Sequence, residues 1–387
     1  MKKNRTLYVW ALMLVGVLLI LFFIFINFIR PSKADTFIPN TDFPFYLDCQ
    51  PSLAVGENGY YYFDRQKSLL YYYDIKREVT YYVCTQPSCS HNTIACNAYF
   101  DPAIFGGLYS YIWSNSGRIY LLGRATETES FSLYSLNMDG GDRKKEFDLC
   151  LYPDSDYIGI AAAIHRGYIY YAISLINTDN TSVKLFRKSL DKSFLNSEEL
   201  FEFSGDKAEI LRIKGFGDKI YFQCYSPSPQ GENNGIYSLE IGNNSPQIVK
   251  QGATREYTVV NSALYYCTNS NVYVKDLKSG DEKIFYEAGM ATSVSYDGNY
   301  FYVDNRPGLQ LTGMGMENRK IVVLDNSGRE IDEIELNNGI GPCLFGDEKY
   351  MFSLCSETPN SLAGERWLEA FDKKQIGTSC HSWSRLP

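Results

Sequence analysis

The sequence predicts an all-β protein, a β-propeller of about seven four-stranded blades, on three observations. Short apolar runs recur from Leu53 to the C-terminus in groups of four, most plainly at residues 158–203. Gly, Asn and Asp gather between these runs, where tight turns require them. Strands this short cannot bury both faces alone, whereas blades stacked around an axis cover one another. Two β-sandwiches are the alternative, and six or eight blades are alternative counts.

The N-terminal part carries no such repeat. The first six residues include three bases, and residues 7–29 form a segment of 23 residues without charge. At about 1.5 Å per residue, a helix of this length crosses the roughly 30 Å hydrocarbon layer. Because a secretory signal has a shorter apolar run, we expect an uncleaved transmembrane anchor rather than a signal cleaved after Ser32-Lys33-Ala34. Residues 1–6 should then stay in the cytoplasm, with the body on the extracytoplasmic side of the cell membrane.

The predicted propeller occupies residues 53–387, after a Pro-interrupted linker at residues 30–52. An open alternative is that residues 42–50 form a further strand that pairs with the last blade. Blades one to three have predicted strands at 53–55, 60–63, 69–73 and 79–83; at 119–122 and 131–136 within 109–149; and at 158–166, 168–175, 182–190 and 198–203. Blades four to seven have them at 210–216, 219–224, 235–240 and 247–250; 257–260, 263–267, 272–277 and 283–286; 293–296, 300–303, 320–325 and 330–336; and 343–345, 350–354, 367–371 and 377–382.

Charge limits the choice of partners. The net charge is −8, and the segment before Asp35 holds five bases and no acid, so the remainder carries −13. A body this acidic argues against nucleic acid and anionic lipid as partners. We therefore expect contact with the membrane only through residues 7–29, an unknown peptide, glycan or protein as ligand, a monomeric chain and no cofactor.

One dense cluster lies in a Cys-rich insertion, residues 84–107, between blades one and two. Its members are Cys84, Cys89, His91 and Cys96, in the spacing Cys-x4-Cys-x-His-x4-Cys. Three thiols and one imidazole are a donor set for tetrahedral zinc. The spacing departs from common zinc knuckles, and a single residue between Cys89 and His91 makes chelation by both awkward.

In an oxidising compartment we prefer disulfides to a metal at this cluster. We expect Cys84 or Cys89 to bond within the insertion, which leaves one cysteine for an outside partner such as Cys49 or Cys150. Cys224 and Cys267, near the ends of second strands, are expected to be small core residues.

Catalytic signatures are scarce. The chain has three His, and the sequence contains no Gly-x-Ser-x-Gly, no His-Glu-x-x-His and no phosphate-binding glycine loop. We predict that His165 is a turn or rim residue and assign no catalytic residue. A carboxylate pair for glycoside chemistry would come from different blades and leave no local motif.

A resemblance follows from these motifs. The insertion, ending in Cys96-Asn97-Ala98-Tyr99-Phe100 behind an apolar N-terminal segment, resembles uncharacterised membrane-anchored propeller proteins of Gram-positive bacteria. The stretch Leu133-Tyr-Ser-Leu-Asn-Met-Asp-Gly-Gly141 is similar to blades of the DUF5050 and low-density-lipoprotein-receptor-type propeller class. The resemblance implies a cell-surface propeller without an established activity.

Our first hypothesis is a membrane-tethered binding or scaffold propeller on the extracytoplasmic side. It would use the top of the ring or its channel for a peptide, glycan or partner protein. The alternative is a propeller enzyme, a hydrolase or lyase acting on glycans. A metal-binding module at residues 84–96 ranks lowest.

Overall fold

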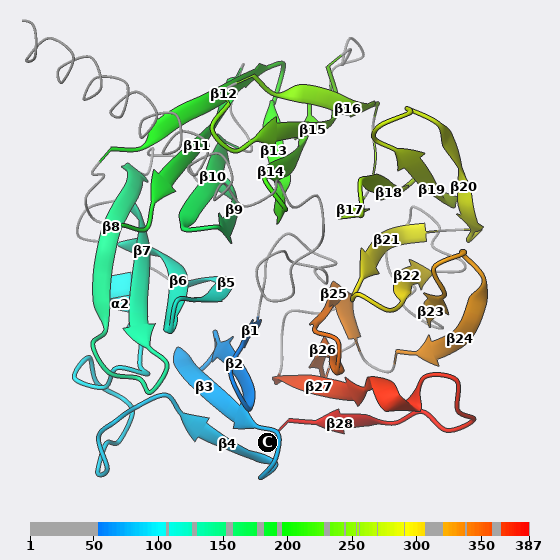
Figure 1. Ribbon diagram of the computed structural model, residues 1–387. Coiled ribbons are helices and arrows are strands. Elements are labelled where there is room, and N and C mark those ends of the chain that lie inside the picture. The colour runs from blue at the N-terminus through cyan, green and yellow to red at the C-terminus, as the bar shows by residue number, and fades with distance from the viewer. Residues whose placement is uncertain are drawn as a thin grey trace, which may run out of the picture.

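The computed structural model is a ring of seven four-stranded antiparallel sheets (Figure 1). The structure describes residues 53–386 apart from 106–107, 126–129, 152–157, 176–181, 192–195, 228–232, 244, 253, 255, 269, 290, 306–319, 337–338 and 358–364. The expected anchor at 7–29 and the linker at 30–52, with Cys49, lie outside these residues. Within the described part, no helix has the length and apolar character to cross a bilayer.

Blades one to three contain β1 (Leu53–Val55), β2 (Gly59–Asp64), β3 (Leu69–Asp74), β4 (Val79–Tyr82), β5 (Leu108–Asn115), β6 (Arg118–Ala125), β7 (Ser130–Asn137), β8 (Lys144–Leu151), β9 (Ile158–His165), β10 (Tyr168–Leu175), β11 (Ser182–Ser189) and β12 (Glu198–Ser204). Blades four and five contain β13 (Glu209–Phe216), β14 (Lys219–Tyr225), β15 (Gly235–Glu240), β16 (Gln247–Gln251), β17 (Tyr257–Val260), β18 (Ala263–Cys267), β19 (Asn271–Asp276) and β20 (Glu282–Glu287). Blades six and seven contain β21 (Ala291–Tyr296), β22 (Phe301–Asn305), β23 (Lys320–Leu324), β24 (Glu330–Glu335), β25 (Gly339–Gly346), β26 (Tyr350–Ser356), β27 (Arg366–Asp372) and β28 (Trp383–Arg385).

Every blade is a simple meander of four consecutive strands. In Figure 1 the first strand of each blade lies toward the middle of the ring and the fourth toward its edge. The predicted seven blades are therefore confirmed, and neither two sandwiches nor six or eight blades describe the chain. Tight turns make the meander: Arg166 and Gly167 join β9 to β10 with φ of 47° and 82°, the left-handed pair that a two-residue hairpin turn needs.

The core lies between blades rather than inside them, as the repeat predicts. One cluster of buried side chains joins blades two and three and includes Trp113, Leu133 and Ile169. Buried tyrosines also reach across: the Tyr111 hydroxyl donates to the Ile160 carbonyl oxygen at 2.8 Å, and the Tyr171 hydroxyl to that of Leu149 at 2.9 Å. Tyrosine suits these positions because its ring packs while its hydroxyl finds a polar partner.

Side chains close the ring, because all described strands of blade seven come from the C-terminal end of the chain. Leu53 and Tyr60 of blade one pack with Phe352, Leu368 and Leu386 of blade seven. The Tyr60 hydroxyl donates to Asp347 Oδ2 at 2.6 Å across the same junction.

Two predictions about single elements were wrong. The fourth strand of blade seven is β28 rather than 377–382, because Asp372 caps a short 3₁₀ turn, η1 (Lys373–Gln375), that delays the chain's return. His165 is not a rim residue. It is 1 % exposed, and its Nε2 lies 2.9 Å from the Gly217 carbonyl oxygen in blade four.

Candidate functional site

The insertion after β4 is held against blade one by backbone pairing. Beyond Val83 the chain leaves the sheet, and residues 98–100 take its place beside β3. The Leu70 amide donates to Ala98 O and the Phe100 amide to Ser68 O, both at 2.9 Å. After α2 (Pro102–Phe105) the chain enters blade two. The buried side chains of Phe100 and Phe105 contact both blades, so the insertion fills the junction between them.

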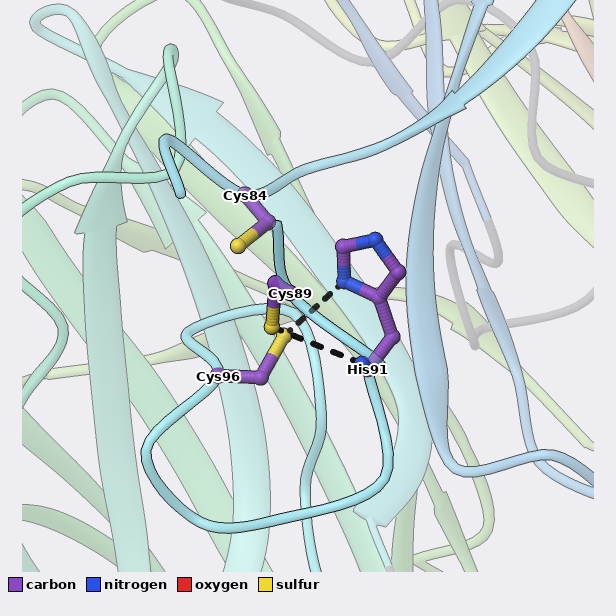
Figure 2. Close-up of side chains that lie close together, drawn as sticks. All are labelled: Cys84, Cys89, His91 and Cys96. Atoms are coloured by element: carbon purple, nitrogen blue, oxygen red, sulfur yellow. Dashed lines mark hydrogen bonds between the residues drawn. The ribbon is translucent and has the colours of Figure 1, made fainter. Parts of the chain in front are cut away.

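The four sequence-predicted residues of this insertion come together. Figure 2 shows the sulfurs of Cys84, Cys89 and Cys96 and the ring of His91 facing one another. One ligand atom from each residue lies within 4.8 Å of all the others. His91 Nδ1 is 3.3 Å from Cys96 Sγ, and the His91 ring stacks on Tyr82 with centroids 4.0 Å apart.

The expected obstacle to using Cys89 and His91 together is absent, and the reason is local backbone geometry. His91 has a φ of 55°, in the left-handed region that non-glycine residues seldom adopt. This conformation turns the imidazole back over the cluster. The backbone N–H of His91 also donates to Cys89 Sγ, at 3.4 Å.

The environments of the thiols differ. The His91 N–H lowers the pKa of Cys89 because a hydrogen bond to sulfur favours the thiolate. Burial raises the pKa of Cys96 to about 12, and this side chain is 0 % exposed. The two neighbouring thiols therefore differ in how readily they lose a proton.

Arg143, on the loop before β8, organises the insertion from outside. Its guanidinium donates to four backbone carbonyl oxygens, those of Ile94 (2.7 Å), Cys96 (2.9 Å), Asn97 (3.2 Å) and Tyr99. It also lies over the rings of Phe100 and Phe105, at 5.1 and 5.3 Å. Sequence reasoning missed Arg143 because its neighbours in the sequence give no sign that it contacts residues 94–99, more than 40 positions earlier.

The predicted disulfides are not confirmed. Among the described residues, Cys84, Cys89 and Cys96 form no disulfide, and the same holds for Cys224, Cys267, Cys355 and Cys380. Cys49 and the Cys150 side chain lie outside the described part. Cys224 and Cys267 are 1 % and 0 % exposed, which confirms them as core residues.

A second candidate site is a pocket of about 620 Å³ between blades six, seven and one. The first turns of these blades, the β3–β4 turn of blade one and the end of β27 form it. Its rim consists of exposed charged and amide side chains and two half-buried tyrosines: Glu57, Asn58, Lys76, Asn299, Tyr300, Glu348, Lys349, Tyr350 and Lys374.

The floor of the pocket is a buried polar network. Lys373 Nζ lies 2.6 Å from Asp297 Oδ2 and also donates to the Asp347 carbonyl oxygen. These side chains are nearly inaccessible, at 6 % for Lys373 and 1 % for Asp297. The Tyr302 hydroxyl donates to Asp297 Oδ2 at 2.6 Å, as Tyr60 does to Asp347.

Burial sets the direction of the pKa shifts in this network. Desolvation lowers the pKa of Lys373, and it raises those of Tyr60 and Tyr302, which also face carboxylates. Each carboxylate has a backbone role too: Asp297 Oδ1 accepts from the amides of Asn299 and Tyr300 at 2.8 Å. Sequence analysis finds Asp297 only as a turn residue, because its partner Lys373 belongs to the next blade, far along the chain.

The geometry defines the class of protein as a seven-bladed β-propeller with four-stranded blades. No protein-family model and no curated protein matches the chain, so the resemblance to the DUF5050 class stays a prediction. Solved structures match at the level of fold. An oligogalacturonate lyase from Vibrio parahaemolyticus has a TM-score of 0.51 at 8% identity, over 84% of this chain and 89% of that one.

Two further structures are similar to a lesser degree. An uncharacterized protein from Listeria monocytogenes has a TM-score of 0.48 at 10% identity, over 70% of this chain and 80% of that one. BamB from Moraxella catarrhalis has a TM-score of 0.44 at 10% identity, over 88% and 86%. Likeness at such low identity concerns the fold alone, and a shared fold does not assign an activity.

Proposed function

We propose that this protein is a membrane-tethered propeller whose extracytoplasmic body binds a polar chain, a glycan or a peptide, in the pocket between blades six, seven and one. The observation that carries the proposal is the pocket itself. It combines half-buried tyrosine rings with exposed lysine, carboxylate and amide groups. Such groups stack on and hydrogen-bond to a hydroxyl-rich or peptide ligand.

Binding is favoured over glycan hydrolysis or cleavage because the two buried carboxylates at the floor of the pocket are already occupied. Asp297 accepts hydrogen bonds from two backbone amides, Tyr302 and Lys373. Asp347 accepts from the amides of Lys349 and Tyr350 and from the Tyr60 hydroxyl. A general acid or base needs a carboxyl group within reach of substrate, and these two form the floor of the pocket instead.

The anchor is proposed from the sequence alone. The apolar run at residues 7–29, preceded by bases, supports a single membrane crossing with the body outside. Cys380, which is exposed, offers a native reporter. A membrane-impermeant maleimide applied to intact cells should label this thiol, and Cys380→Ser should remove that label. Labelling of Cys380 only after lysis would refute the orientation.

Ligand binding is tested with the full chain in detergent micelles on glycan and peptide arrays. The rim variant Lys349→Ala/Lys374→Ala is compared with Lys67→Ala, which lies on the β2–β3 turn at the other end of blade one. Hydrogen bonds to charged groups contribute about 1.5–3 kcal/mol, so the rim variant should bind at least about tenfold more weakly, and Lys67→Ala should bind normally. Equal binding by the wild type and both variants would exclude this pocket as the binding site. Turnover of a bound glycan would show that the protein is an enzyme instead.

A further inference from the structure

The Cys/His cluster of the insertion is separate from the pocket, and its function is inferred separately. We propose that Cys84, Cys89, His91 and Cys96 bind one Zn²⁺ ion as a structural site that fastens the insertion to blades one and two. The donor set, three thiolates and one imidazole nitrogen, is one of the combinations that structural zinc uses. Four protein ligands leave no open coordination position, so the site would not be catalytic.

The spacing of the ligand atoms suits a tetrahedral ion. Zinc bonds of about 2.3 Å to sulfur and about 2.0 Å to nitrogen place ligand atoms roughly 3.5–3.8 Å apart. His91 Nδ1 and Cys96 Sγ are 3.3 Å apart, and every pair lies within 4.8 Å. Movements of an ångström or less at the more distant pairs would complete the tetrahedron. Coordination through Nδ1 leaves the proton on Nε2.

Backbone amides support two of the sulfurs. The Gln86 N–H donates to Cys84 Sγ at 3.5 Å, and the His91 N–H donates to Cys89 Sγ at 3.4 Å. In both cases the donor lies two residues after the cysteine. Hydrogen bonds of this kind stabilise negative charge on sulfur and orient ligands around a metal.

Arg143 supplies a matching charge. A zinc ion with three thiolates and a neutral imidazole carries a net charge of −1. The Arg143 guanidinium lies directly behind the ligand loop, where it contacts the carbonyl oxygens of Ile94, Cys96, Asn97 and Tyr99. The cation therefore lies where it would stabilise both the loop and the charge of the metal site.

A disulfide accounts for less of this arrangement. One bond among three cysteines leaves a third thiol and gives no role to His91, whose uncommon φ of 55° turns its ring over the sulfurs. Without a metal, ordering an insertion that has little regular secondary structure would cost conformational entropy. A zinc ion employs all four side chains and offsets that cost.

The test measures metal in the full chain, purified in detergent without chelator, by inductively coupled plasma mass spectrometry. We expect about one zinc per chain for the wild type. Cys84→Ser and Cys96→Ser should lose it, and Cys380→Ser, outside the cluster, should retain it. Because a variant can fail to fold, the wild type is also reconstituted anaerobically with Co²⁺ after reduction. Its visible spectrum should show tetrahedral coordination with thiolate charge-transfer bands.

Thiol alkylation of the wild type tests the zinc site in a second way. A zinc chelator should speed alkylation of Cys84 and Cys89 and leave that of Cys380 unchanged. Non-reducing peptide mapping of protein taken directly from cells should find the three insertion cysteines reduced. A disulfide among them, or a reduced wild type that takes up neither Zn²⁺ nor Co²⁺, would overturn the proposal.

Discussion

Blade one is joined to its two neighbours in different ways. At blade seven the junction brings together residues from opposite ends of the propeller: Tyr60 and Asp347 are 287 positions apart. Packed apolar side chains and the buried Tyr60–Asp347 hydrogen bond close it. At blade two the junction is local, and an insertion with little regular structure fills it. The described blades exchange no strand, so side chains hold the closing junction. More chain entropy is lost there than at the local junction, because closure brings together residues far apart in the sequence.

One cation organises the junction between blades six and seven and another that between blades one and two, and the two cations are of different kinds. Lys373 places a compact ammonium group between the Asp297 carboxylate and the Asp347 carbonyl. Arg143 spreads its planar donors over four neutral carbonyl oxygens. A point charge suits a single buried carboxylate, whereas a fork of several donors suits a loop of carbonyls. Replacing Lys373 should therefore leave a buried carboxylate without its cation, whereas replacing Arg143 should loosen a loop.

The largest effect is expected at the junction between blades six and seven, next to the closing junction. Lys373→Met should lower the free energy of unfolding by about 3–5 kcal/mol, because it leaves the Asp297 carboxylate buried without its cation. The double variant Lys373→Met/Asp297→Asn should recover part of that loss. Lys374→Met, at the exposed neighbouring position, is the matched control. Urea denaturation measures all three, and a Lys373→Met protein as stable as the control would mean that the buried pair does not hold blades six and seven together.

A smaller and more local effect is expected at the blade one–two junction. Arg143→Ala should lower stability by about 2 kcal/mol, since hydrogen bonds made by a charged donor contribute roughly 1.5–3 kcal/mol. Hydrogen exchange should accelerate in residues 84–105 and remain unchanged in blades four and five. Lys145→Ala is the control, because Lys145 forms an exposed ion pair with Asp148, worth at most about 1 kcal/mol. Exchange that accelerates evenly around the ring would contradict a local role for Arg143.

The sequence was sufficient for the blades because their signals are local. Period-two apolar runs and turn residues such as Arg166-Gly167 specify strands and hairpins wherever they occur. The prediction failed at the fourth strand of blade seven, where the capped turn after Asp372 uses up residues that the blade pattern assigns to a strand. Blade number and blade order followed from the repeat.

The candidate sites were predictable only in part. Spacing drew attention to Cys84, Cys89, His91 and Cys96, but their convergence depends on the left-handed backbone of His91, which no periodic pattern encodes. The pocket depends on turns from three blades, so its Lys373–Asp297 pair leaves no trace in any single stretch of sequence. Local chemistry can be found in a sequence, whereas contacts between distant turns require the ring.

The smallest expected effect is a change in how the stability of the closing junction depends on pH. The folded-state pKa of Tyr60 is raised by burial and by Asp347. In the unfolded chain a tyrosine loses its proton near pH 10. Between those two values the folded state binds the extra proton, so stability must fall as pH rises above about 10, by up to about 1.4 kcal/mol per pH unit for each such group.

Tyr60→Phe should therefore make the alkaline fall in unfolding free energy less steep, even though the loss of its hydrogen bond lowers stability at neutral pH. Tyr81→Phe is the matched control, because Tyr81 is 40% exposed on β4 and faces no buried carboxylate network. Urea denaturation of the three proteins between pH 8 and about pH 11 measures the slopes. Equal slopes for Tyr60→Phe and wild type would mean that the Tyr60 hydroxyl is accessible to water, and that the junction between blades seven and one is open rather than closed.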